Sequence, residues 1–167
     1  MNSNTTFFFM NYEIKLAAEK DIPGIFNLLR EFAEFENLAH EFLITEESLR
    51  EAVFGEYAFV HLIIGLSECN LIAFALLYPK YASFRGERSL YLEDLYVKPE
   101  FRGKGFGLKM LRRAAKLAKE KGFQRLDWQA LKWNQPAIDF YNKIGAESDD
   151  GNINFRLKGK NFDDLAS

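Results

Sequence analysis

The sequence is poor in the residues that build disulfide frameworks and zinc sites. Among its 167 residues there is one cysteine, Cys69, which excludes an internal disulfide bond and suits a reducing compartment such as the cytoplasm. A lone cysteine with no histidine nearby in the sequence is more often inert than nucleophilic. The two histidines, His40 and His61, lie far apart, so we expect no bound metal ion.

Long apolar runs are also missing. No stretch approaches the ~20 residues that span a membrane, so we expect neither a membrane helix nor a membrane partner. Three consecutive phenylalanines near the start are not preceded by a basic segment, which argues against a signal peptide. We therefore expect residues 1–11 to be an N-terminal extension, with a start at Met1 or Met10, and residues 12–167 to form one domain.

Charge is distributed unevenly along the chain. The net charge is −2, yet residues 98–125 hold ten Lys or Arg and two acids, whereas residues 31–56 hold eight Glu and one Arg. One segment is therefore suited to an anion and another to a cation. We expect no nucleic-acid partner, because a solvated helix face accounts for most of the basic residues and no aromatic residues alternate with them.

The hydrophobic pattern predicts an α+β fold. The predicted elements run strand, two helices, three strands, helix, strand, helix, strand, which indicates a single domain with a mixed, mostly antiparallel central sheet flanked by helices. A polar loop is expected at residues 79–89. Strands are expected at residues 12–17, 59–64, 71–78, 90–97, 125–131 and 154–157, and helices begin near residues 21, 45, 106 and 134.

A basic glycine loop, RGKGFG at residues 102–107, follows one of these strands and opens a helix. The N–H groups of such a loop and of the first helical turn lack internal partners, and the helix dipole adds positive partial charge, which predicts an anion site. The three glycines allow positive φ and close approach of a ligand. The loop is not a P-loop, because no Lys-Ser or Lys-Thr closes it. It also lacks the dinucleotide fingerprint, because Leu108 occupies the position of the last glycine.

Three segments together resemble the GNAT acetyltransferase superfamily. They are YLEDLYV at residues 91–97, the R-x-x-G-x-G loop after it, and WNQPAIDFYNKIGA at residues 133–146. YLED and the AEFE of residues 33–36 are similar to the diamine acetyltransferases, the spermidine/spermine and thialysine group. The resemblance covers roughly residues 12–158. It implies a GNAT fold, acetyl-CoA as cosubstrate, a small primary amine as substrate, and a homodimer.

The resemblance also implies roles for single residues. Tyr141 would stand near the sulfur atom of the coenzyme, Glu93 would face the amine, and Phe35 and Glu36 match an aromatic–acid pair that contacts substrate. Backbone groups of residues 95–97 would contact the pantetheine arm, and the loop would hold the pyrophosphate. The residues implied in cofactor binding are Leu95, Tyr96, Val97, Arg102, Gly103, Lys104, Gly105, Phe106, Gly107, Leu108, Asn134, Pro136, Ala137 and Tyr141.

The chemistry independently supports some of these roles. An alkyl amine, with a pKa near ~10.4, arrives protonated, so a base must take its proton before direct attack in a ternary complex. Strands disfavour Glu, which makes Glu93 a candidate base. Tyr141 is a reasonable acid for the leaving thiolate. Its position on a helix taken alone favours a core aromatic, and the surrounding WNQPAIDFY segment favours the acid role. Strict alternation places Glu93 and Asp94 on opposite faces, so one acid could be structural and Asp94 could contact substrate. A strand N–H near Leu95 or Tyr96 would polarise the carbonyl.

The identity of the amine is left open. The polyamine enzymes carry acids and a Trp in the loop that here reads SFRG at residues 83–86, and Arg85 and Arg88 would repel a polyamine if they face the site. That favours a smaller amine, or an amino acid whose carboxylate an Arg could pair.

Two alternative functions remain: acetylation of a protein N-terminus or lysine, and a non-catalytic module that binds acyl-CoA or nucleic acid. Glu93 and Tyr141 argue against a mere binding module.

Overall fold

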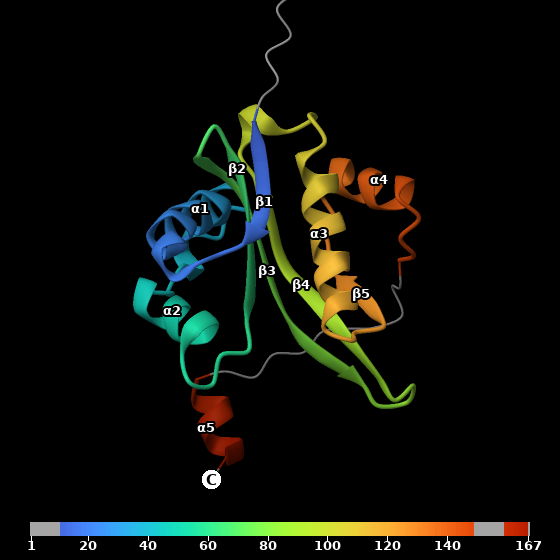
Figure 1. Ribbon diagram of the computed structural model, residues 1–167. Helices are drawn as coiled ribbons and strands as arrows, with labels where there is room; N and C mark the ends of the chain where they lie inside the picture. The colour runs from blue at the N-terminus through green and yellow to red at the C-terminus, as the bar shows by residue number, and fades with distance from the viewer. Residues whose placement is uncertain (1–10, 149–158, 167) are drawn as a thin grey trace, which may run out of the picture. The chain divides into compact units, whose positions relative to one another are not determined.

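The computed structural model describes residues 11–148 and 159–166, which form two compact units divided between Gln129 and Ala130 (Figure 1). The first unit contains the sheet, and the second contains α4 (Gln135–Lys143) and α5 (Lys160–Ala166). The strand predicted at residues 154–157 and nearly all of the predicted extension lie outside the described residues. The domain bounds of 12–167 therefore stay a prediction.

A single five-stranded sheet organises the first unit. Its strands follow one another in sequence order, and neighbours are antiparallel from the first to the fourth, whereas the fifth joins the fourth in parallel. This mixed, mostly antiparallel sheet confirms the predicted fold class. The strands are β1 (Tyr12–Leu16), β2 (His61–Ser67), β3 (Asn70–Ala82), β4 (Glu87–Val97) and β5 (Arg125–Trp128).

Helices cover both faces of this sheet (Figure 1). We call the side that carries α1 (Ile22–Phe35) and α2 (Glu46–Phe54) the α1 face, and the side that carries α3 (Phe106–Glu120) the α3 face. Short 3-10 turns connect these elements at Glu19–Asp21, Ala39–Glu41 and Pro99–Phe101.

Apolar packing on each face holds the sheet against its helices. On the α1 face, Ile22 and Ile25 pack with Phe74 and Tyr96 of the sheet, and the burial of each such side chain stabilises the fold by about 1.5–3 kcal/mol. On the α3 face, one side of the helix is buried at helical spacing. Its buried residues are Phe106, Met110, Leu111, Ala114, Leu117 and Ala118.

The β3–β4 hairpin is longer than the sequence indicated. The loop predicted at residues 79–89 is wrong, because β3 continues to Ala82 and β4 begins at Glu87, with residues 83–86 as the connection. Pro79 is tolerated inside β3 because β2 begins opposite Leu77, so at the level of Pro79 the other side of β3 needs no N–H donor. Gly86, with φ of 62°, takes the left-handed position in this turn.

Candidate active site

A β-bulge interrupts the pairing of β3 with β4 at Glu93. Asp94 pairs with Leu76 and Leu92 pairs with Leu77, so Glu93 is an extra residue that has no counterpart on β3. Bulges bend a strand and redirect its side chains, and they are frequent next to active sites.

The bulge brings Glu93 and Asp94 to the same face of the sheet. Asp94 lies opposite Leu76, and Tyr96, two residues further on, belongs to the core of the α1 face. Tyr78, two residues after Leu76, shares this face and donates a hydrogen bond from its Oη to Oε2 of Glu93 at 2.9 Å. The prediction that the two acids point to opposite faces is therefore wrong, since alternation fails where a strand contains an extra residue.

Three carboxyl groups interact on this face: Glu93, Asp94, and Glu36 directly after α1. Burial, followed by the charges of Glu93 and Glu36, raises the pKa of Asp94 from 3.8 to about 7. Burial also raises the pKa of Glu36. Burial and the hydrogen bond to Glu93 raise the pKa of Tyr78, so its hydroxyl stays protonated and remains a donor. We call these four residues the acidic cluster; it is suited to a cationic ligand.

The outer edge of β4 is open beside this cluster. Pairing with β5 ends at Leu92 and Trp128, and beyond that point no other strand among the described residues pairs with this edge. The N–H of Lys98 donates to the carbonyl of Ile72, so Tyr96, two residues earlier, directs its N–H toward β3. Leu95, at the alternate position, therefore directs its N–H to the open edge, and it is a better candidate than Tyr96 for a free backbone donor.

The glycine loop lies where β4 leads into α3 (Figure 1). Gly103 and Gly105 have φ of 71° and 80°, in the left-handed region, and Gly105 occupies the N-cap position of α3. Gly107 lies inside the helix, so two of the three glycines supply the unusual φ. Within the described residues, the backbone N–H groups from Gly103 to Leu108 donate to no backbone carbonyl, which leaves them available to an anion.

Arg102 makes several contacts within the first unit. Its Nε donates to the carbonyl of Val97 at 2.8 Å, and its own N–H donates to the carbonyl of Pro99. Its guanidinium lies 4.2 Å from the ring centroid of Phe35 and 5.5 Å from that of Tyr96. The structure thus joins Phe35, expected in the substrate site, to Arg102, expected in the cofactor site, and a role of Arg102 in holding the coenzyme stays a prediction.

The remaining predicted residues belong to the second unit. Asn134 caps α4 as predicted, and its side chain accepts a hydrogen bond from the N–H of Ala137 at 3.3 Å. Pro136 stands in the first turn of the helix. Tyr141 is half-buried next to Phe140, with ring centroids 5.4 Å apart, and burial raises the pKa of its hydroxyl. The first unit therefore brings together Glu36, Glu93, Asp94 and the loop, and the second unit carries Asn134, Pro136, Ala137 and Tyr141.

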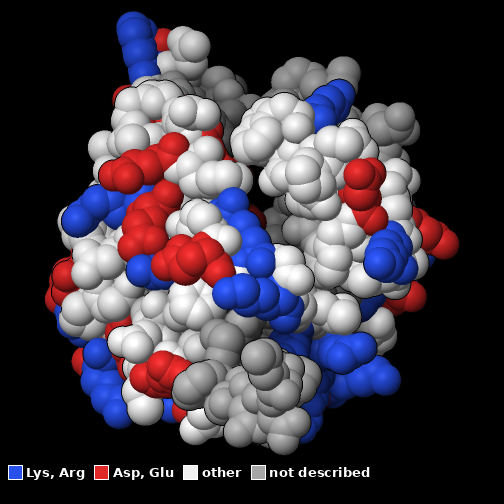
Figure 2. Space-filling model, turned by 90° about the horizontal axis from the view of Figure 1, so that it is seen from above, with Lys and Arg blue, Asp and Glu red and all other residues white. Residues whose placement is uncertain are grey.

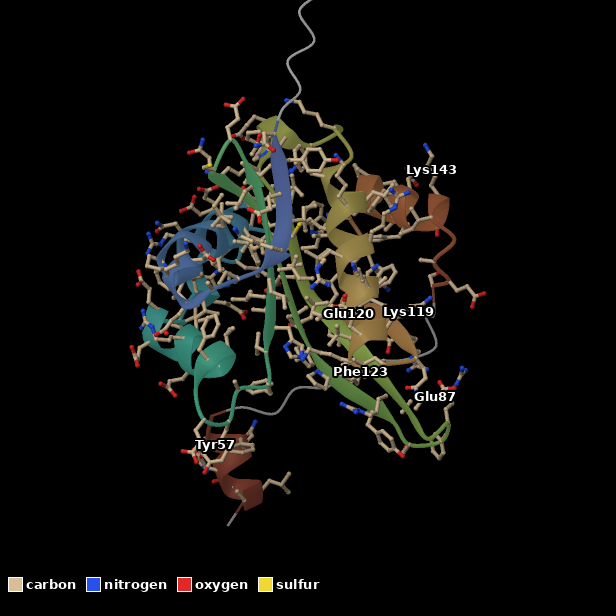
Figure 3. All side chains as sticks on the ribbon, viewed as in Figure 1. Tyr57, Glu87, Lys119, Glu120, Phe123 and Lys143 are labelled. Atoms are coloured by element: carbon tan, nitrogen blue, oxygen red, sulfur yellow. The ribbon has the colours of Figure 1, made fainter. Side chains whose placement is uncertain are left out.

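Sequence reasoning missed Tyr78, the residue that positions Glu93. The signal that could have found it is a Tyr at 78 and a Tyr at 91 on consecutive strands, where the rings lie 5.3 Å apart as a cross-strand pair. Arg88 was expected to repel a polyamine if it faced the site. Its guanidinium instead lies over the ring of Phe123, 4.6 Å from the ring centroid. Phe123 follows α3 at the base of β4, on the side away from α1 (Figure 3).

Three further observations concern surface charge, metal ligands and membrane helices. In Figure 2 acidic side chains gather on the side of α1, and basic side chains border them, in agreement with the uneven charge of the sequence. In the part of the chain that the structure describes, no group of three or more His, Cys, Asp or Glu is arranged to hold a metal ion. Across the same residues, none of the helices combines the length and the hydrophobicity that crossing a membrane requires.

Comparison with known proteins agrees with this arrangement. The chain matches the Acetyltransferase (GNAT) family over residues 22–146. It is 37% identical over 164 residues to the thialysine N-epsilon-acetyltransferase of Mus musculus, and this match covers 92% of this chain and 96% of that protein. It is 27% identical over 179 residues to the L-ornithine N5-acetyltransferase of Arabidopsis thaliana, covering 80% of this chain and 78% of that protein.

A solved structure gives the same result for the fold. An integron cassette protein from V. cholerae has a TM-score of 0.77 and 27% identity, and the match covers 94% of this chain and 98% of that one. The family match covers most of the sequence, and it agrees with the sheet order and with the bulged strand that leads into a glycine loop. The chain belongs to the acetyltransferase (GNAT) family.

Proposed function

We propose that this enzyme transfers the acetyl group of acetyl-CoA to a primary amine of a small molecule, by direct attack in a ternary complex. The observation that carries the proposal is the acidic cluster on the α1 face, which lies beside the open edge of β4 and on the strand that leads into the anion-binding loop. A cationic acceptor and an anionic donor would thus be held by consecutive parts of one strand and loop.

Residues of the first unit fit the donor. The N–H groups from Gly103 to Leu108 would hold the pyrophosphate at the start of α3, supported by the charge of Lys104. Backbone groups at the open edge, Leu95 foremost, would hold the pantetheine arm and polarise the acetyl carbonyl. Acetyl-CoA supplies the activated acetyl group when bound. We predict further contacts from Asn134, Pro136 and Ala137 of α4.

Residues of the acidic cluster fit the acceptor. An ammonium group would be attracted to Glu36 and Asp94, and its proton must leave before the amine can attack. Glu93 is the predicted base, fixed by Tyr78, and Asp94 is a second candidate because a pKa of about 7 suits a base that works near neutral pH. Tyr141 would then donate the proton that the departing thiolate takes up.

The class of amine follows from the relatives and from the site. Relatives named for thialysine and L-ornithine act on small amines that also carry an amino-acid end, which supports a diamine or amino-acid-like substrate for this enzyme. The family resemblance further supports a homodimer in the cytoplasm, and light scattering on the purified protein would test the dimer.

An amine panel tests the proposed function. The purified protein is incubated with acetyl-CoA and, separately, diamines, polyamines, diamino acids, aminoglycosides and peptides with a free N-terminus, and release of the coenzyme thiol is followed. We expect turnover with small amines and little with peptides. Preference for peptides would favour the alternative of protein acetylation, and absence of both turnover and calorimetric binding of acetyl-CoA would refute the proposal.

A further inference from the structure

A row of interacting side chains runs along the α1 face from the acidic cluster toward the tip of the β3–β4 hairpin. Glu93 accepts the hydrogen bond of Tyr78, the rings of Tyr78 and Tyr91 lie 5.3 Å apart, and Nζ of Lys80 lies 5.0 Å from the ring centroid of Tyr91. Each member touches the next, so the row has carboxylates at one end and an ammonium group at the other.

The spacing of this row follows from the register of the hairpin. Lys80 pairs with Ser89, Tyr78 with Tyr91, and each step of two residues along a strand advances about 7 Å. Lys80 is exposed, and among the described residues no carboxylate lies within ion-pair distance of its Nζ. Its charge is therefore available to a ligand that extends from the acidic cluster along the row.

Other cations near the hairpin are differently placed. Arg125 shares the α1 face, since it pairs in parallel with Ser89, but Glu87 and Asp127 engage its guanidinium at 3.7 and 3.0 Å. Glu87 stands near the tip of the hairpin on β4 (Figure 3). Arg88 lies over Phe123 on the α3 face.

We propose that Lys80 is a specificity-determining residue, which pairs with an anionic group at the far end of the amine substrate and disfavours substrates whose far end carries an ammonium group without an accompanying anionic group. This inference rests on the proposed function and deepens it. A diamino acid bound with its reacting amine at Glu93 and Asp94 would direct its carboxylate toward Lys80, whereas a diamine of the same length would bring like charges together.

Two matched substrate pairs test this inference. L-lysine and 1,5-diaminopentane differ only in the carboxylate, and so do L-ornithine and 1,4-diaminobutane. For each pair, the ratio of kcat/KM is measured in the wild type and in Lys80→Met. We expect Lys80→Met to lower the amino acid to diamine ratio by about tenfold, mostly through loss on the amino acid. Lys80→Arg, which keeps the charge, should retain most of the ratio.

Arg88→Met is the matched control, because it removes a cation from the same hairpin on the opposite face. An unchanged ratio in Lys80→Met, or an equal change in Arg88→Met, would overturn the inference. The four ligands are also titrated by calorimetry into the wild type, Lys80→Met and Arg88→Met. Lys80 is thus tested by binding even if no turnover occurs. Failure of turnover in the wild type would count against the proposed function, whereas an unchanged binding ratio would count against Lys80.

Discussion

Asp94 is the residue whose protonation the fold controls most directly. The bulge turns its carboxyl inward beside two other acids, and the pKa rises from 3.8 to about 7. A charged Asp94 is therefore costly in the free enzyme, and an ammonium ligand would relieve that cost by neutralising the cluster. The same carboxyl could thus contribute both to the affinity for a cation and to its deprotonation.

The raised pKa predicts how stability depends on pH. As the pH increases, the unfolded chain releases this proton near 3.8, whereas the folded protein keeps it until about 7, so folding stability is lost across this window. Asp94→Asn mimics the protonated acid and abolishes the loss. We expect the melting temperature of the variant, relative to wild type, to increase by about 5 °C between about pH 5 and about pH 8. Calorimetry at several pH values measures it, and a constant difference would contradict the assignment.

Tyr78 is expected to act through Glu93. Glu93→Gln should lower kcat/KM about 100-fold at neutral pH, with partial recovery at high pH, where the amine loses its proton unaided. Tyr78→Phe removes the 2.9 Å hydrogen bond and should lower kcat/KM about tenfold, with the KM for acetyl-CoA unchanged. In the double variant the effect of Tyr78→Phe should disappear, because its partner is already altered.

The control for this cycle is Tyr91→Phe. It removes a hydroxyl from the same face and keeps the ring that stacks at 5.3 Å, without touching the bond to Glu93. Additive losses for Tyr78→Phe and Glu93→Gln, or an equal loss in Tyr91→Phe, would indicate that Tyr78 has only a packing role.

At the scale of elements, the segment from β4 through the loop to α3 joins the two halves of the proposed site. β4 carries the acids and an open edge, and the left-handed glycines place the first turn of α3 at its end. Because these glycines bring the N–H donors into position, we expect their backbone geometry to matter more for coenzyme binding than the side-chain charge of Arg102, which packs on Phe35.

The loop geometry gives a prediction with an internal control. Gly105→Ala forces an alanine to adopt φ of 80°, which should cost about 1–2 kcal/mol of stability. If the loop shifts to relieve this strain, the Kd for acetyl-CoA should increase about tenfold. Gly122→Ala carries the same strain, at φ of 74° and with open space for its Cβ, but at the other end of α3. It should lose similar stability and keep its affinity; equal affinity in both variants would separate the loop from coenzyme binding.

Elements defined by local patterns were predictable from the sequence, and features set by strand pairing were not. The glycine loop and the helix that follows it depend on residues adjacent in the chain, and so does the cap at Asn134. The bulge at Glu93 depends on the register between β3 and β4, which no local pattern encodes. The hairpin was mistaken for a loop because Pro79 and the charged residues are typical of loops, although an edge position accommodates both.

At the scale of the whole molecule, the residues proposed for catalysis belong to both units. The first unit carries the acids and the anion loop, and the second carries Tyr141 on α4. Only the family resemblance indicated that Glu93 and Tyr141 act in the same reaction, since no residue pattern by itself relates position 93 to position 141. The uneven charge was also readable from the sequence, and acidic groups do gather on the side of α1 (Figure 2).

Tyr141→Phe tests the contribution of the second unit. Loss of the phenolic proton should lower kcat about tenfold to 100-fold, with the calorimetric Kd for acetyl-CoA unchanged, because the ring remains. A poorer leaving group should be affected more than a good one, so acyl thioesters of thiols with different pKa values provide a second readout. An unchanged kcat would assign Tyr141 to packing beside Phe140.

The long β3–β4 hairpin also bears on how the molecule behaves in a crowded solution. Past Leu77, β3 continues without β2 beside it, and such a strand edge can recruit a strand from another chain. Pro79 offers no N–H to an incoming strand, and Lys80 places a charge next to it. Pro79 and Lys80 are therefore expected to protect this edge from β-type aggregation. Since Lys80 is also the residue proposed to set substrate choice, a substitution at position 80 that changes selectivity would also reduce solubility.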